Sequence, residues 1–212
     1  MTKPKPPEDT PPHLHSLQEL RSAVNACRRC GRWEHATQGV PGEGAAHAPL
    51  MLVGEVPGDA EDLAGHPFVG PAGALLDRAL VEAGLERTET YVSNAVKHFG
   101  FELRGKRRLH MKPSISEIKA CSVWLAEELR LVKPRLVVAL GSTAARALLG
   151  KAVTITSLRA RALALPPPSS AHAWVTVHPS FLLRMPDEST RHEEQRRFIE
   201  DLRRAAAWLR EH

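Results

Sequence analysis

Short apolar runs alternate with segments of helical periodicity along most of this chain. The apolar runs have the profile of buried strands, and they lie at 50–54, 90–96, 135–140 and 173–177. Between them apolar residues recur with helical spacing, in the segments 17–26, 72–83, 115 to about 131, 142–150 and 190–210. Strands that alternate with helices predict a parallel sheet with helices on both faces. We therefore expect an α/β fold with three layers, α/β/α, around a central four-stranded parallel sheet.

The first residues differ from this pattern. Segment 1–15 is rich in proline, lysine and acidic residues and has no apolar stretch typical of a signal peptide, so we expect a disordered lead-in. Segment 16–212 shows neither an internal repeat nor a linker, and we interpret it as one domain. No run of about 18 apolar residues is present, so we expect no membrane-spanning segment. Without an export signal or an obvious oligomerisation element, we expect a cytoplasmic monomer.

The charge balance is moderately basic. Lysine and arginine outnumber aspartate and glutamate by 29 to 24, which gives a net charge of +5. Such an excess is compatible with a polyanionic partner, but it is also common in proteins without one. A basic loop at 104–112 contains Lys106, Arg107, Arg108 and His110. These side chains can bind phosphate, and the same run is also typical of a solvated loop.

Polar residues follow the ends of all four predicted strands. They are Gly54-Glu55-Val56-Pro57-Gly58-Asp59, Asn94, Gly141-Ser142 and His178-Pro179-Ser180. In an open parallel sheet the ligand crevice lies beyond the carboxyl ends of the strands. Each element alone is as typical of an ordinary turn, but four of them together predict a site at this edge.

The three cysteines have a spacing that leaves several roles open. Cys27 and Cys30 form a C-x-x-C pair, and Cys121 lies far away on a predicted helix. An odd number in a reducing compartment disfavours a disulfide framework. A redox pair, a metal site completed by a histidine, and buried thiols all remain compatible with this spacing.

At this point the motifs carry a family resemblance. The chain from about 27 to 210 resembles the uracil-DNA glycosylase superfamily, and most closely its iron–sulfur branch with the family-4 enzymes. The motifs occur in the expected order, and they are Gly54-Glu55-Val56-Pro57-Gly58, Gly65-His66-Pro67-Phe68-Val69-Gly70-Pro71-Ala72-Gly73, Tyr91-Val92-Ser93-Asn94 and His178-Pro179-Ser180.

Two further features resemble the UdgX group within this branch. His98 stands where family-4 enzymes usually carry a cluster cysteine, and the inserted Lys106-Arg107-Arg108-Leu109-His110 is similar to the K-R-R-I-H loop of that group. In UdgX proteins the histidine of this loop becomes covalently attached to the abasic sugar. Val56 departs from the pattern, because UdgX relatives often have glutamine there, and this puts one hydrogen bond near the base in doubt.

The resemblance implies roles for individual residues. The catalytic residues would be His110, Glu55, Asp59 and His178. The substrate-binding residues would be Phe68, Asn94, Val56, Gly54, Ser180 and Arg184. Contacts to DNA would come from Lys106, Arg107 and Arg108. A [4Fe-4S] cluster would be held by Cys27, Cys30, His98 and Cys121, with zinc as the alternative because three cysteines and a histidine also form a zinc set.

The function that follows from the resemblance is excision of uracil from DNA, single strands included, with free uracil as product. His110 would then bond to C1′ of the sugar, and the protein would associate with the nucleoid when bound to DNA. Two alternatives remain open. One is a turnover glycosylase in which water completes the reaction, and the other is a non-catalytic iron–sulfur protein that only binds DNA.

Overall fold

The computed structural model describes residues 13–212 except residue 160. Residues 1–12, which make up most of the predicted lead-in, therefore lie outside the described part of the chain. None of the helices in the described part is long and apolar enough to cross a membrane. The assignment of 16–212 to one domain stays a prediction.

A mostly parallel sheet forms the centre of the molecule. Its strand order is β1-β3-β2-β6-β8-β7. The strands are β1 (Glu43–Gly44), β2 (Leu50–Gly54), β3 (Thr90–Asn94), β6 (Leu136–Leu140), β7 (Leu163–Ala164) and β8 (His172–Thr176). The four inner strands are parallel, which confirms the predicted four-stranded core, and the edge strands β1 and β7 are antiparallel. The edge strands comprise two residues each, too few for their pattern to be visible in the sequence.

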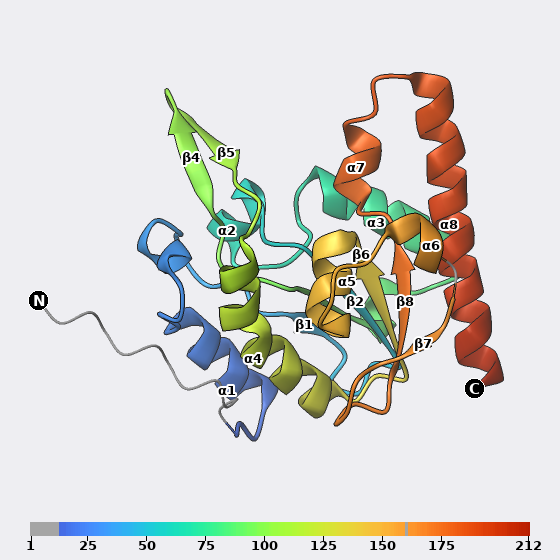
Figure 1. Ribbon diagram of the computed structural model, residues 1–212, viewed down its shortest axis with the longest axis horizontal. Coiled ribbons are helices and arrows are strands. Elements are labelled where there is room, and N and C mark those ends of the chain that lie inside the picture. The colour runs from blue at the N-terminus through green and yellow to red at the C-terminus, as the bar shows by residue number, and fades with distance from the viewer. Residues whose placement is uncertain (1–12, 160) are drawn as a thin grey trace, which may run out of the picture.

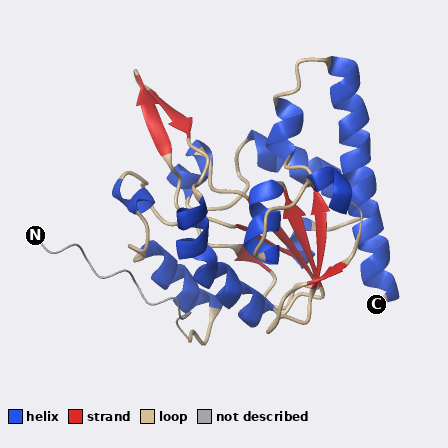
Figure 2. Ribbon diagram, viewed as in Figure 1, coloured by secondary structure: helices blue, strands red, loops and turns tan. Residues whose placement is uncertain are grey.

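Helices cover both faces of this sheet, as Figure 2 shows. They are α1 (Leu17–Asn25), α2 (Asp59–Ala64), α3 (Pro71–Glu82), α4 (Ile115–Val132), α5 (Ser142–Leu149), α6 (Ile155–Leu158), α7 (Pro179–Leu183) and α8 (Glu188–Glu211), with 3-10 turns at Gly31–Glu34 and Arg87–Glu89. The predicted α/β/α class is therefore correct. The short helices α2, α6 and α7 were not predicted, because four to six residues carry too little helical periodicity.

The alternation of side chains along each strand explains the three layers. On β2, Leu50 and Leu52 pack against α3 and α8, in a buried cluster that includes Leu76 and Phe198. The intervening strand residues Met51 and Val53 belong to a second cluster, with side chains of α4 and α5. Successive residues of a strand point to opposite faces. A continuous apolar run is therefore typical of a strand in a sheet that is buried on both faces. A third cluster joins α1 to α4.

The predicted basic loop is largely a β-hairpin. Strand β4 (Phe101–Arg104) pairs antiparallel with β5 (Arg107–His110), so the expectation of a loop at 104–112 was wrong for residues 104 and 107–110. Gly105 at the turn has a φ of 61°, a conformation that glycine adopts without strain. Charged side chains on both faces hid the alternation expected of a strand. Figure 1 shows the hairpin and α7 at the same end of the molecule as the arrowheads of β6 and β8.

Candidate active site

Side chains from several segments meet beyond the carboxyl ends of the parallel strands. They enclose a cavity of about 450 Å³. Its lining residues are Glu55, Val56, Gly58, Glu61, Phe68, Ala72, Asn94, His110, Lys112, His178, Ser180 and Arg184. All predicted catalytic and substrate-binding residues are among them except Gly54 and Asp59.

Gly54 lies against two side chains that line the cavity, those of Phe68 and Asn94, and its lack of a side chain leaves room for them. It is the last residue of β2 and pairs in register with Asn94, the last residue of β3. A Cβ atom on Gly54 would lie 2.4 Å from Asn94 Oδ1 and 2.6 Å from Phe68 Cζ. Phe68 itself has a φ of 57°, which is uncommon for a residue with a side chain. The absent side chain of Gly54 thus allows an aromatic ring and a carboxamide to converge at one point.

His178 is held in a defined tautomer at the start of α7. The backbone N–H of Ser180 donates to His178 Nδ1 at 3.1 Å, so Nδ1 carries a lone pair rather than a proton. Burial lowers the pKa of His178 to about 4, and the ring is therefore neutral at pH 7 with its proton on Nε2. The ring stacks against Phe68, with centroids 5.8 Å apart and planes inclined by 29°. This region thus offers one neutral N–H donor beside an aromatic face.

His110 approaches the same cavity from the hairpin. Its Nε2 lies 3.9 Å from Glu55 Oε1, and 45% of its side chain is exposed. Burial lowers the pKa of His110, against the opposing effect of Glu55. The other carboxylate oxygen of Glu55 accepts a hydrogen bond of 2.5 Å from Thr143 Oγ1. Thr143 was not predicted, although its place in the first turn after β6 is the kind of strand-end position that the sequence indicated.

Arg108 attaches the hairpin to the body of the protein. Its Nε lies 2.5 Å from Asp59 Oδ1 and its Nη1 lies 2.6 Å from Asp62 Oδ2. The guanidinium also lies over the rings of Phe99 and Phe101, at 5.3 and 5.0 Å from their centroids. The predicted catalytic Asp59 and the predicted DNA contact Arg108 are therefore ion-pair partners, and Asp59 does not line the cavity. The catalytic role of Asp59 stays a prediction.

Two loops of the cavity are joined by Glu61, which sequence reasoning missed. Its carboxylate oxygens accept hydrogen bonds from the backbone N–H groups of Gly58 and Gly70, each at 2.9 Å. On the opposite side, Arg184 Nη1 donates to Ser180 Oγ at 3.1 Å. A capping carboxylate three residues after Gly58, at the start of a helix, is the signal that was available for Glu61.

The three cysteines come together away from this cavity. Cys27 and Cys121 are buried, and Cys30 is half-buried. Burial raises the pKa of the Cys121 thiol to about 12, and Cys30 and Cys27 lie close enough to add to this effect. Cys27 Sγ accepts a hydrogen bond from Trp124 Nε1, and Cys121 Sγ accepts one from the N–H of residue 97, both at 3.2 Å. The fold thus brings together the three thiols that the family resemblance implied as ligands.

The fourth predicted ligand, His98, is buried nearby. Its charged neighbours are Asp62 and Arg28, and the latter lies inside the C-x-x-C loop. In the described part of the chain, no set of three or more histidine, cysteine or acidic side chains is spaced to hold a single metal ion. The arrangement is therefore a cluster of thiols with a nearby histidine, rather than a tight tetrahedral site.

Comparison with known proteins identifies the family. The pattern that defines the uracil DNA glycosylase superfamily matches residues 41–203. The chain belongs to this superfamily. A type-4 uracil-DNA glycosylase of Thermotoga maritima is 34% identical over 203 residues, which cover 92% of this chain and 95% of that protein.

Other glycosylases match over shorter stretches. A type-4 uracil-DNA glycosylase of Sulfurisphaera tokodaii is 38% identical over 129 residues, which cover 60% of this chain and 56% of that protein. A type-5 uracil-DNA glycosylase of Pyrobaculum aerophilum is 36% identical over 147 residues, which cover 63% of this chain and 62% of that protein. The match thus spans less than two thirds of the length of these two relatives.

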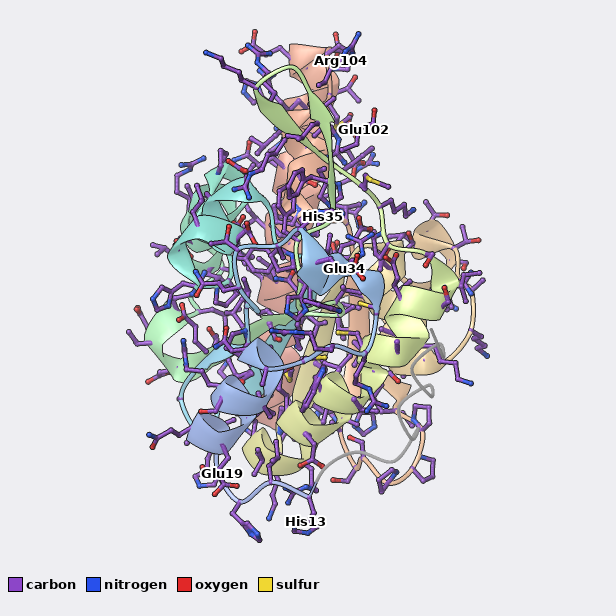
Figure 3. The ribbon with its side chains drawn as sticks, turned by 90° about the vertical axis from the view of Figure 1, so that its left-hand side faces the viewer. His13, Glu19, Glu34, His35, Glu102 and Arg104 are labelled. Carbon is purple, nitrogen blue, oxygen red and sulfur yellow. The ribbon has the colours of Figure 1, made fainter. Side chains whose placement is uncertain are left out.

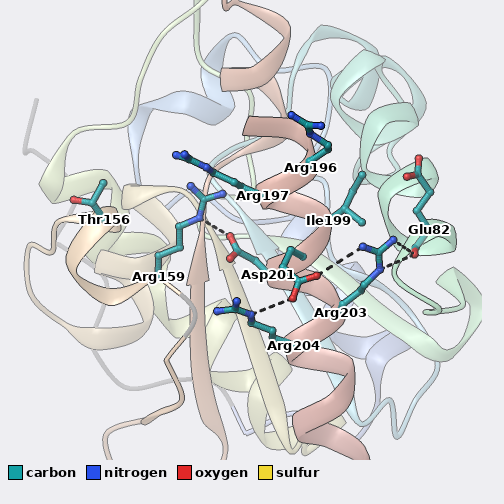
Figure 4. Close-up of a pocket in the computed structure, with 10 residues that line it drawn as sticks. Glu82, Thr156, Arg159, Arg196, Arg197, Ile199, Asp201, Arg203 and Arg204 are labelled. Atoms are coloured by element: carbon teal, nitrogen blue, oxygen red, sulfur yellow. Dashed lines mark hydrogen bonds and ion pairs between the residues drawn. The ribbon is translucent and has the colours of Figure 1, made fainter. Parts of the chain in front are cut away.

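A larger cavity, of about 820 Å³, lies between α3, α6 and α8 (Figure 4). Its arginines mostly bond to groups within the protein. Arg159 lies 2.6 Å from Asp201, Arg204 lies 3.2 Å from Glu200, and Arg203 donates to the carbonyl oxygen of Glu82. None of the predicted site residues lines this cavity. Its charges serve the packing of α8, and the strand-end cavity is the candidate active site.

Proposed function

We propose that this superfamily member excises uracil from DNA, single strands included, and then bonds to the abasic sugar through His110. The proposal rests on one observation above all. A neutral N–H donor on His178, an aromatic face on Phe68 and a carboxamide on Asn94 line the same cavity that His110 approaches. The second half of the proposal follows the resemblance of the hairpin to the UdgX group.

Recognition begins with a nucleotide that is extruded from its stack or taken from a single strand. The ring of Phe68 then stacks on the base, as aromatic side chains do with splayed nucleotides. Asn94 pairs with the uracil edge, because a carboxamide presents a donor and an acceptor together. Val56 is an apolar residue at the cavity wall, and it offers no hydrogen bond where UdgX relatives often have glutamine.

Excision depends on the charge that develops on uracil. As the glycosidic bond breaks, its electron pair moves to the base, and a carbonyl oxygen becomes negative. The Nε2–H of His178 donates to that oxygen, and preorganised donors of this kind commonly supply the largest part of catalysis. Because burial lowers the pKa of His178 to about 4, the ring acts as a neutral hydrogen-bond donor rather than a cation.

The covalent step uses the electrophile that uracil leaves behind. A lone pair on a ring nitrogen of His110 forms a bond to C1′ of the oxocarbenium-like sugar. The imidazole becomes cationic at that moment and loses the proton on its other nitrogen, while the departing uracil anion takes up a proton and leaves as free uracil. Glu55, which is 3.9 Å from His110, orients the ring or accepts the proton.

DNA reaches this cavity past the hairpin. Lys106 and Arg107 are exposed, and the hairpin that carries them lies at the opposite end of the molecule from α1, as the labelled Glu102 and Glu19 show in Figure 3. We propose that these cations contact phosphates, which attract lysine and arginine irrespective of sequence. Ser180 and Arg184 supply phosphate contacts on the other side of the cavity.

We also propose that Cys27, Cys30, Cys121 and His98 hold a [4Fe-4S] cluster. In such a cluster each ligand binds a different iron, so the ligand atoms lie farther apart than around a single ion. The three thiols lie close enough to interact electrostatically, and two of them accept N–H hydrogen bonds, which supports this ligand set. When bound, the cluster would link the segment that follows α1, which carries Cys27 and Cys30, to α4, which carries Cys121. Iron and sulfide analysis of purified protein, with its visible spectrum, supports the cluster, whereas stoichiometric zinc without iron contradicts it.

The function is tested with uracil-containing single-stranded DNA on a denaturing gel. Wild-type protein is expected to give a retained protein–DNA band, and His110→Ala is expected to release uracil without that band. Glu102→Ala, an exposed change on the same hairpin, serves as the matched control and is expected to keep the band. Alkali-sensitive abasic sites without a retained band would indicate a turnover glycosylase. Absence of both products would leave a protein that only binds DNA.

A further inference from the structure

A buried ion pair lies directly behind Asn94. Lys97 and Glu128 have fully buried side chains, and Lys97 Nζ lies 2.7 Å from Glu128 Oε2. The same ammonium group donates to Ser93 Oγ at 2.6 Å and to the backbone carbonyl oxygen of Asn94 at 2.7 Å. Neither Lys97 nor Glu128 was assigned a role from the sequence.

The hydrogen bonds of this pair are complete. An ammonium group has three N–H donors, and Lys97 uses them on Ser93, Asn94 and Glu128. Glu128 Oε1 accepts from the backbone N–H of Gly42 at 2.9 Å, and Glu128 Oε2 also accepts from Ser93 Oγ at 2.8 Å. A network in which every donor and acceptor is satisfied holds its members in one arrangement.

Stability alone does not account for this arrangement. Replacing a buried ion pair by apolar residues of similar size is often neutral or stabilising, because removing two charges from water is costly. The geometry of this pair has another consequence. It holds the carbonyl group of Asn94, on the residue where β3 ends, while the next N–H groups, of Ala95 and Val96, are bound to the carbonyls of Gly54 and Glu55. The backbone that carries the Asn94 carboxamide is therefore fixed from both sides.

The same residue reaches the thiol cluster. The backbone N–H of Lys97 donates to Cys121 Sγ at 3.2 Å. Cys121 and Glu128 both lie on α4, so one helix holds the backbone of Lys97 at one point and its side chain at another.

We propose that Lys97 and Glu128 are a positioning pair, which sets the direction of the Asn94 carboxamide and thereby the discrimination of uracil from other bases. This inference rests on the proposed function, because it assigns base recognition to Asn94. Lys97 does not touch the base in this account. It acts through the backbone of Asn94, and its loss is expected to change the direction of the carboxamide while the other side chains that line the cavity stay in place.

The test uses the full-length double variant K97M/E128Q. Methionine removes the charge with little change in volume, and glutamine keeps an acceptor for the N–H of Gly42, so neither buried charge is left unpaired. The matched control is E127Q/R130M, which removes another ion pair of the same helix. That pair bonds to the backbone of Leu14 instead of Asn94.

Two readouts separate positioning from stability. The chain contains only two asparagines, Asn25 and Asn94, so selective ¹⁵N-asparagine labelling gives two side-chain amide signals, with Asn25 on the surface as the internal reference. In K97M/E128Q the Asn94 signals are expected to shift or broaden while those of Asn25 stay in place. The single-turnover rate of uracil release, relative to that of cytosine, is expected to fall by about tenfold or more, the order associated with one lost recognition hydrogen bond.

The outcomes decide between the possibilities. The proposal is supported when the Asn94 signals move, uracil discrimination falls, the melting temperature stays close to that of wild type, and E127Q/R130M changes neither readout. It is overturned when the Asn94 signals stay unchanged, or when they move and discrimination stays within about twofold. Failure of wild-type protein to release uracil is visible without any variant, and it removes the proposed function and this inference together.

Discussion

The two sides of the candidate active site are built differently. On one side, Phe68 lies on the loop between α2 and α3 and is 5% exposed, and Asn94 ends the buried strand β3 and is 3% exposed. On the other side, His110 has a side chain that is 45% exposed and stands on a two-stranded hairpin outside the main sheet. The proposed recognition of uracil thus belongs to the buried side, with Phe68 and Asn94, and the proposed covalent step belongs to the exposed side, with His110.

The forces that hold the two sides also differ. The strand-end side is supported by hydrogen-bonded ladders on both flanks of β2 and by two apolar clusters. An isolated two-stranded hairpin is marginal in water, and this one is anchored through Arg108 to Asp59 and to the fully buried Asp62. Loss of the hairpin anchor should therefore uncouple trapping from excision, whereas damage to the strand-end side should abolish both.

The largest expected effect concerns the strand-end side. His178→Ala should lower the rate of uracil release by about 10²–10³, because it removes a donor aimed at the developing charge. Trapping should fall equally, since the electrophile forms only when uracil leaves. Single-turnover release of uracil measures this. His172→Ala, at the other end of β8, is the control, and an equal loss in both variants would contradict the proposed role.

A smaller effect is expected at the hairpin anchor. Arg108→Met keeps an apolar stem over Phe99 and Phe101 but removes the ion pairs with Asp59 and Asp62. Trapping should slow by about tenfold, in line with the loss of charge-assisted hydrogen bonds, while uracil release stays within about threefold. Quantified band formation and uracil release give the two rates. Arg104→Met, which removes an exposed arginine of the same hairpin, is the control, and equal slowing of both rates in Arg108→Met would mean that the two sides are not separable.

The pH dependence distinguishes the two histidines. His110 attacks only as a neutral imidazole, and burial lowers its pKa below the ordinary value of 6.5. The neutral form therefore predominates above about pH 6.5, so the trapping rate should be flat there and should fall a few-fold only at lower pH. Uracil release should hold to lower pH, because the pKa of His178 is about 4. A trapping rate that still rises between pH 7 and 8 would contradict this account.

The smallest effect is expected at the tip of the hairpin. Lys106→Ala should leave the rates at saturating DNA unchanged and weaken binding evenly across sequences, with the slope of log K against log salt reduced by about 0.7 for one phosphate contact to a single strand. Titrations with single-stranded DNA that contains no uracil, at several salt concentrations, measure this slope. Arg210→Ala, at the far end of α8, is the control, and an equal change there would indicate a nonspecific effect of net charge.

Part of this fold was predictable because it follows from hydrophobic patterns within short segments of the sequence. Apolar runs such as Leu50–Gly54 are buried on both faces, so their composition alone indicates inner parallel strands. The edge strands β1 and β7, the short helices and the hairpin were missed, because two to six residues, or charged residues on both faces, carry no periodicity. Their conformation depends on the chain segments beside them.

The candidate active site was also predictable only in part. The rule that ligands bind beyond the carboxyl ends of parallel strands correctly brought Glu55, Asn94 and His178 to one cavity. Thr143 and Glu61 were missed because their importance lies in which atoms they bond. The family resemblance implied a catalytic role for Asp59, and only the folded hairpin reveals that this residue pairs with Arg108.

The residue pattern alone established the fold class, the strand-end location of the site and the chemical groups available in it, because each of these follows from short-range periodicity and from motifs within a few residues. Only the tertiary structure decided that burial keeps His178 neutral, how the hairpin is held, and that Lys97 and Glu128 lie behind Asn94. These features join residues 31 to 46 positions apart, or depend on burial, and both are determined only when the whole chain has packed.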